Sequence, residues 1–172
     1  MEREAMTRDQ KISEIAIHLI CEASMRRDLW RATSIGLIHD EATIPFVLKR
    51  NELPLVSASF TEGDWYVWTT QRLVSVCDKK HYEVNAESLI RAAFGNFKES
   101  PQLVNPPAGL IHTNIATLSS TRGVAARIRY ETGYASMGPI QCLKYWELKH
   151  PILDKLMTPE EHAAFRRQRN QG

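Results

Sequence analysis

The sequence has few cysteines and no long apolar stretch. Its three cysteines, Cys21, Cys77 and Cys142, are far apart and odd in number, and their spacing matches no zinc-binding pattern. They are typical of reduced cysteines in an intracellular protein. The absence of a run of about 18 apolar residues excludes a membrane-spanning helix, and the charged start MEREAMTRDQK lacks the apolar segment of a secretory signal. We therefore expect a cytoplasmic protein.

The sequence also lacks an excess of either charge. It contains 22 basic and 20 acidic residues, for a net charge of +2, which gives no strong electrostatic attraction for nucleic acid. We therefore expect no nucleic-acid partner. The chain has 172 residues, 43% of them hydrophobic, and no internal repeat. This is long enough to bury one sizeable core, so we expect a single domain over residues 1–172.

The hydrophobic pattern predicts a helix at the start of the chain and strands after it. Over residues 8–25 apolar residues recur at helical spacing, and Thr7 with Gln10 fits a capping box. From residue 33 the pattern changes to the alternation of strands. The expected strands are 33–39, 44–50, 55–60, 65–69, 73–77, 81–84 and the two arms of a hairpin around STRG at 120–123.

The C-terminal third of the chain predicts two further helices. Gly138-Pro139 suits a helix start, and this helix is expected to run to about Lys149 and to stop before Pro151. A short helix follows Thr158, which is placed to cap it. Between the strands, residues 88–97 fit either a helical turn or a bent strand.

This order of elements predicts an α+β fold that is mainly antiparallel β. A run of strands followed by a helix is typical of a small barrel or orthogonal sandwich capped by a C-terminal helix. The N-terminal helix at 8–25 and a helical tail at 151–172 are expected as additions to a core at 30–150.

The stretch DWYVWTTQRLVSV, with HYEV and GNFK after it, resembles a region of the pleckstrin-homology-like superfamily, in its bacterial and GRAM-type branches. Thr69 to Arg72 stand where those domains have a threonine-x-arginine turn between strands. The later RIRYETGYA and the helix from Gly138 fit the family's last strand and terminal helix. The resemblance covers roughly residues 30–150. It implies a non-catalytic domain that binds lipids, peptides or proteins.

The aromatic cluster at 65–68 has two interpretations. Alternation places Trp65 and Val67 on one face of a strand and Tyr66 and Trp68 on the other. The first interpretation puts one face in the core and the other partly under a helix. The alternative, a stacking platform for nucleobases, requires interleaved basic residues, and the nearest ones fall at strand ends. The pattern therefore favours a core role.

The sequence contains no recognisable catalytic group. Cys77 has His81 four residues on, but a turn separates them and no third orienting residue can be identified. Ser119 and Ser120 lack the glycines of a nucleophile elbow, and no glycine-rich phosphate loop is present. The histidines are scattered without metal-ligand spacing. We expect no cofactor, no metal site and no enzymatic activity, with an unrecognised hydrolase as an alternative.

The leading functional hypothesis is a protein-binding module. A small domain with extra terminal helices suits an immunity protein that blocks a cognate toxin, or an adaptor that recruits another protein. The STRG hairpin tip and the loop at 99–109 are the preferred contact regions. The candidate contact residues are Gln102, Asn105, Arg122, Arg127 and Arg129.

A second hypothesis is a peripheral membrane protein that binds anionic lipid head groups. It requires that basic residues from separate turns gather at one end of the sheet structure. The candidate residues are Lys49, Arg50, Lys79 and Lys80. The alternative for all of them is an ordinary solvated strand surface, and a membrane partner is less favoured than a protein partner.

Overall fold

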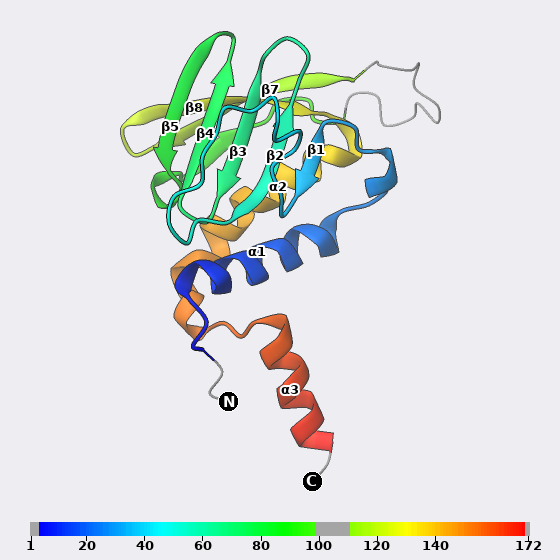
Figure 1. The fold of residues 1–172 in the computed structure, drawn as a ribbon, viewed down its shortest axis with the longest axis vertical. Helices are drawn as coiled ribbons and strands as arrows, with labels where there is room; N and C mark the ends of the chain where they lie inside the picture. Colours follow the sequence, from blue (N-terminus) through cyan, green and yellow to red (C-terminus); the bar gives the residue numbers. More distant parts are fainter. Residues whose placement is uncertain (1–3, 99–110, 171–172) are drawn as a thin grey trace.

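The computed structural model describes residues 4–98 and 111–170, and over these residues the fold is α+β, as expected. The strands form two antiparallel sheets, with the orders β1-β2-β3-β4-β5 and β6-β7-β8. In the described part of the chain the sheets do not close into one barrel, because β5 forms a strand ladder only with β4, and β8 only with β7. Figure 1 shows β7 and β8 running across the strands of the first sheet.

The elements have the following bounds. The first sheet consists of β1 (Thr33–Ile35), β2 (Pro54–Ser59), β3 (Trp65–Thr69), β4 (Arg72–Cys77) and β5 (Lys80–Asn85). The second sheet consists of β6 (Arg91–Ala93), β7 (Thr113–Ser120) and β8 (Gly123–Glu131). The helices are α1 (Arg8–Ala23), α2 (Met137–Lys144) and α3 (Pro159–Asn170).

Helix α1 begins where the sequence predicts. The Thr7 hydroxyl accepts a hydrogen bond from the Gln10 amide at 3.2 Å, and the Thr7 amide donates to the Gln10 side chain at 2.8 Å. This reciprocal capping box satisfies two amides that the first turn leaves without partners. Ile12, Ala16 and Ile20 then form a buried stripe. The stripe packs beside α2 and over β1 and β2, so α1 completes the same core as the sheets.

Helix α2 approaches β2 closely because it contains Gly138. A Cβ atom at this position would lie 3.0 Å from a methyl group of Val56, which is tighter than most Cβ contacts, so Val56 would have to shift. The helix was expected to continue regularly to about Lys149. Instead it gives way to a π-helix at Tyr145–Lys149 and a 3₁₀-helix at His150–Lys155. The chain continues through Pro151 because the first turn of a helix does not need that amide.

The strand expected at 44–50 does not form. This segment is irregular, and Ile44 with Phe46 packs instead over Trp65 and Val67 on the outer face of β3. All the side chains of β3 are therefore buried, as the core interpretation predicted. The second face of this strand was expected to lie partly under a helix. That prediction was wrong, because the irregular segment 44–50 covers it. The sequence of 44–50 is apolar enough for a strand, but here it serves as a lid.

The turns between strands agree with the sequence. Gly63 in TEGD has φ +90°, a conformation that favours glycine. Asp78 and Lys79 both have positive φ and connect β4 to β5 as a two-residue hairpin turn. The STRG hairpin is present between β7 and β8. The ambiguous segment 88–97 contains β6, which follows a 3₁₀-helix at Ala86–Ser88.

A buried carboxylate ties the beginning of β1 to the end of β8. Glu131 accepts hydrogen bonds from the amides of Arg31 and Ala32 and from the Thr33 hydroxyl, each at 2.9 Å. Only 7% of Glu131 is exposed. These bonds join segments about a hundred residues apart in the chain.

The substitution Glu131→Gln should destabilise the fold. Glutamine offers one acceptor oxygen and places an amide N–H group against the remaining donors, so a buried polar group loses its partner at a cost of about 2 kcal/mol. Urea denaturation followed by tryptophan fluorescence measures the change. Glu147→Gln, an exposed position, is the matched control, and equal effects of the two substitutions would contradict this role of Glu131.

Candidate functional site

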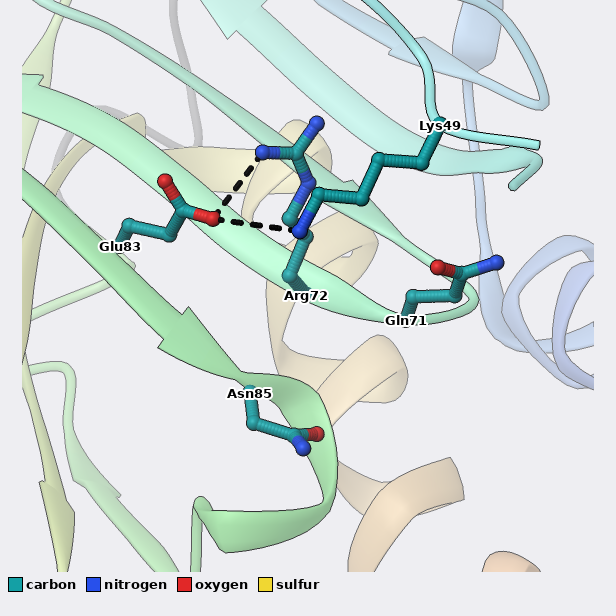
Figure 2. Close-up of a pocket in the computed structure, with 5 residues that line it drawn as sticks. All are labelled: Lys49, Gln71, Arg72, Glu83 and Asn85. Atoms are coloured by element: carbon teal, nitrogen blue, oxygen red, sulfur yellow. Dashed lines mark hydrogen bonds and ion pairs between the residues drawn. The ribbon is translucent and has the colours of Figure 1, made fainter.

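A polar pocket of about 230 Å³ lies at the β3–β4 turn and along β5. It is lined by Lys49, Gln71, Arg72, Glu83 and Asn85. In Figure 2 the side chains of Arg72 and Lys49 both point toward the carboxylate of Glu83. The pocket thus brings together Arg72 and Lys49. Arg72 belongs to the TTQR stretch on which the family resemblance rests, and Lys49 is one of the candidate lipid-binding residues.

Arg72 uses its guanidinium group entirely within the protein. Its Nε and one terminal nitrogen bind the two oxygens of Glu52 at 2.9 and 3.2 Å. The other terminal nitrogen binds Glu83 at 3.1 Å, and the carbonyl of Val47 accepts a further bond at 2.9 Å. The guanidinium carbon also lies 4.8 Å from the centre of the Phe46 ring. Arg72 therefore fastens the irregular segment before β2 to the sheet.

Glu52 is the buried end of this ion pair. Its side chain has no exposed surface, and it also accepts hydrogen bonds from the Lys49 amide and the Thr69 hydroxyl, both at 2.6 Å. Burial alone raises the pKa of Glu52, but the hydrogen bonds from Arg72, Lys49 and Thr69 outweigh it and hold the pKa below its ordinary value. The hydrogen bond from Arg72 likewise lowers the pKa of Glu83.

The pocket has no surplus positive charge for an anion. Its two cations, Lys49 and Arg72, face two carboxylates, and Lys49 lies 3.6 Å from Glu83. Arg50 is exposed beside the pocket, where its carbonyl accepts a bond from Gln71. An anionic head group would have to displace Glu83 in order to bind here.

The other two residues of the lipid hypothesis lie elsewhere. Lys79 and Lys80 are at the β4–β5 turn, the opposite end of β4 from Arg72. Lys80 lies 5.3 Å from the centre of the Tyr82 ring. The four basic residues named for lipid binding are therefore divided between the two ends of the β4–β5 hairpin.

A second ion-paired cluster involves two candidate contact residues on β8. Arg129 binds the buried Asp64 at 2.8 Å and Asp78 at 3.4 Å, and it donates to Thr113 at 3.1 Å. Arg127 lies 3.7 Å from Asp78. The two arginines share a strand face, as predicted, but Arg129 is held by carboxylates of the other sheet. Its guanidinium is therefore committed to the fold, whereas Arg127 remains partly exposed.

Cys77 lies beside this cluster. Its sulfur and the carboxylates of Asp64 and Asp78 are close enough to share a cation, but Arg129 already supplies the positive charge. Burial, followed by the two carboxylates, raises the pKa of Cys77, so its thiol is protonated. Cys77 is buried and His81 is exposed on the neighbouring strand. This pair therefore has neither the orientation nor the ionisation of a nucleophile and its base.

The tip of the β7–β8 hairpin is exposed. Arg122 and Val124 flank Gly123, whose φ of +109° shapes the turn. Val124 is 66% exposed. Figure 1 shows this hairpin end extending past β5. The remaining candidate contacts, Gln102 and Asn105, lie outside the described residues.

A cluster around His150 could not be identified from the sequence. Its ring nitrogens lie 3.2 Å from the Tyr145 hydroxyl on one side and 3.2 Å from both Glu87 and Arg8 on the other. Burial lowers the pKa of His150 and raises that of Tyr145. The buried phenol is therefore protonated. The contacts of His150 join α1, the segment after β5 and the end of α2. No spacing in the sequence indicates contacts across such distances.

Comparisons with protein-family models, curated proteins and solved structures found no match to this chain. The pleckstrin-homology-like resemblance therefore stays a prediction that rests on the TTQR stretch and on the order of the elements. Among the helices of residues 4–98 and 111–170, none is both long enough and apolar enough to cross a bilayer.

The Glu52–Arg72 pair predicts a specific pH dependence of stability. Because the folded-state pKa of Glu52 is lowered, its contribution is present above the ordinary pKa of about 4.3 and is lost as the pH falls through the folded-state value. Glu52→Gln should cost about 3 kcal/mol at pH 7, because Arg72 loses a buried partner. The difference from the unmodified protein should shrink on acidification.

Urea denaturation at pH 7 and at about pH 3 measures both quantities. Glu62→Gln, at an exposed turn position, should change neither the stability nor its pH dependence. A stability difference for Glu52→Gln that is the same at both pH values would contradict an ionised, paired Glu52.

Proposed function

We propose that this protein is a non-catalytic protein-binding module with a pleckstrin-homology-like core, of the immunity or adaptor type. It acts in the cytoplasm, where it blocks or recruits one cognate protein, such as a toxin. The observation that carries the proposal is the contrast between the exposed β7–β8 tip and the ion-paired body. Arg72 and Arg129 are committed to internal carboxylates, whereas Arg122 is exposed at a protruding turn.

The composition of the tip suits protein recognition. An arginine next to an apolar side chain combines directional hydrogen bonding with apolar area, and arginine is enriched among the residues that dominate binding energy. Val124 supplies the apolar part beside Arg122. The β7–β8 ladder runs over most of both strands, with one register shift between Leu118 and Ser119, so the tip is carried on a long paired hairpin. A preorganised tip loses little conformational entropy on binding.

The tip inhibits or recruits by occupying a complementary recess on the partner. Arg122 pairs with a carboxylate or carbonyl groups there, and Val124 fills an apolar position beside it. Arg127, which is partly exposed on the same strand, extends the contact toward the body. Inhibition of a toxin by this route is steric, because the tip covers the partner's own functional site and needs no chemistry.

The chemistry of the body supports binding rather than catalysis or lipid capture. Burial keeps the Cys77 thiol protonated, which does not favour Cys77 as the nucleophile of a hydrolase. The Lys49 ammonium group is paired with Glu83, and Lys79 lies at the far end of β4. No concentrated basic surface is thus available for an anionic head group at these positions.

Arg122→Glu should weaken binding to the cognate protein at least tenfold, which is the loss typical of one dominant interface residue. Affinity capture from the native host, with mass spectrometry, identifies the partner, and calorimetry on the purified pair gives the Kd. Arg50→Glu, the same charge change at the exposed edge of the pocket, should leave the Kd unchanged. Equal losses for both variants, or none for Arg122→Glu, would refute the tip as the contact.

Vesicles provide the test of the lipid alternative. The protein should not sediment with phosphatidylserine-containing vesicles in a salt-dependent manner, because Lys49 is paired and the lysines are dispersed. Sedimentation that is lost in both Lys49→Glu and Lys80→Glu, and at high salt, would replace the protein-binding proposal with lipid binding.

A further inference from the structure

Helix α3 stands apart from the core. None of its residues is buried, and Phe165 is 51% exposed. Figure 1 shows α3 projecting below α1 from the end of the molecule opposite the sheets. A helix of this length is marginal in water by itself. Its capping box at Thr158 and Glu161 stabilises the first turn, and α3 contacts α1, but about half of Phe165 stays exposed.

The residues around Phe165 form a charged face with a definite polarity. At about 3.6 residues per turn, Phe165 has Glu161 and His162 as neighbours one turn before it, and Gln168 and Arg169 one turn after it. The face therefore carries an acidic residue at one end, an aromatic residue in the middle and a basic residue at the other end. Glu161 and Arg169 are equally distant from Phe165 in the sequence.

This face is complementary to itself in the antiparallel direction. If a two-fold axis passes beside Phe165, Glu161 of one chain lies opposite Arg169 of the other, and the same pair recurs on the other side of the axis. A parallel arrangement would instead place like charges together. The opposite side of α3 carries Ala163 and Arg167, with no large apolar residue to anchor a partner. The charge pattern thus favours a second copy of this chain as the occupant.

We propose that α3 is a dimerisation helix that pairs antiparallel with α3 of a second copy through Phe165, Glu161 and Arg169. Two helices of this length bury less than the roughly 1,200 Å² of a stable interface. Exposed apolar residues just before α3, Ile152 at 43% and Met157 at 45%, supply additional area. The dimer is accordingly of modest affinity, with a Kd on the order of micromolar.

Analytical ultracentrifugation over a range of concentrations tests this proposal. The unmodified protein should show a reversible monomer–dimer equilibrium. Phe165→Ser and Arg169→Glu should each weaken dimerisation at least tenfold, the second because it places two glutamates opposite each other. Arg167→Glu is the matched control: it makes the same charge change on the opposite side of α3 and should leave the equilibrium unchanged.

Mixing two variants gives the decisive measurement. Glu161→Arg and Arg169→Glu should each be monomeric alone, yet an equimolar mixture should form a heterodimer. In the mixed pair both cross-axis positions again hold opposite charges, one pair with its original sign and the other with its sign reversed. Circular dichroism checks that both variants keep their helix content, since Glu161→Arg also removes the capping bond to the Thr158 amide. A monomeric unmodified protein, equal effects of Arg167→Glu and Arg169→Glu, or no association in the mixture would each overturn the proposal.

The outcome is separable from that of the proposed function. The dimerisation variants lie on α3, whereas Arg122 lies at the β7–β8 tip. Failure of self-association leaves partner binding by Arg122 untouched, and failure of Arg122→Glu to weaken partner binding leaves the dimer in place.

Discussion

The ion pair between Glu52 and Arg72 is the constraint on which the outer half of the structure depends. A buried carboxylate is tolerated only when charge and hydrogen bonds compensate for lost hydration, and Glu52 receives both from Arg72, Thr69 and the Lys49 amide. Because Arg72 also binds the Val47 carbonyl, the pair holds an irregular segment over β3. That segment buries Trp65 and Val67, which would otherwise form an exposed apolar face.

Charged side chains of β8 likewise bind partners within the protein, and they connect the second sheet to the first. The alternation of this strand sends Ile128 and Tyr130 into the core and leaves Arg127, Arg129 and Glu131 on the other face. The side chains of Arg129 and Glu131 then bind Asp64 and the amides before β1. Residues that look like a solvent-exposed charged strand in the sequence are therefore cross-links between segments. This is why we place the proposed binding surface at the hairpin tip rather than along the strand.

Local signals in the sequence predicted the local structure well. The capping residues Thr7 and Thr158 marked two helix starts, and Gly63 marked a turn, because these features involve neighbours within a few residues. The strand predicted at 44–50 was wrong because its apolar residues suit a strand or an irregular covering segment equally. Only the otherwise uncovered face of β3 decides between the two. The contacts of Arg72 with Glu52 and of His150 with Arg8 join distant positions, so no periodicity or spacing could indicate them.

The positions of the two proposed interfaces have a joint consequence. The β7–β8 tip and α3 lie at different ends of the molecule (Figure 1), so pairing through α3 leaves the tip of each copy free. A dimer then presents two Arg122-bearing tips on one particle. If the partner is itself repeated or clustered, the second contact becomes intramolecular and the apparent affinity rises without any new interaction. A weak helix pair can in this way strengthen a small hairpin contact.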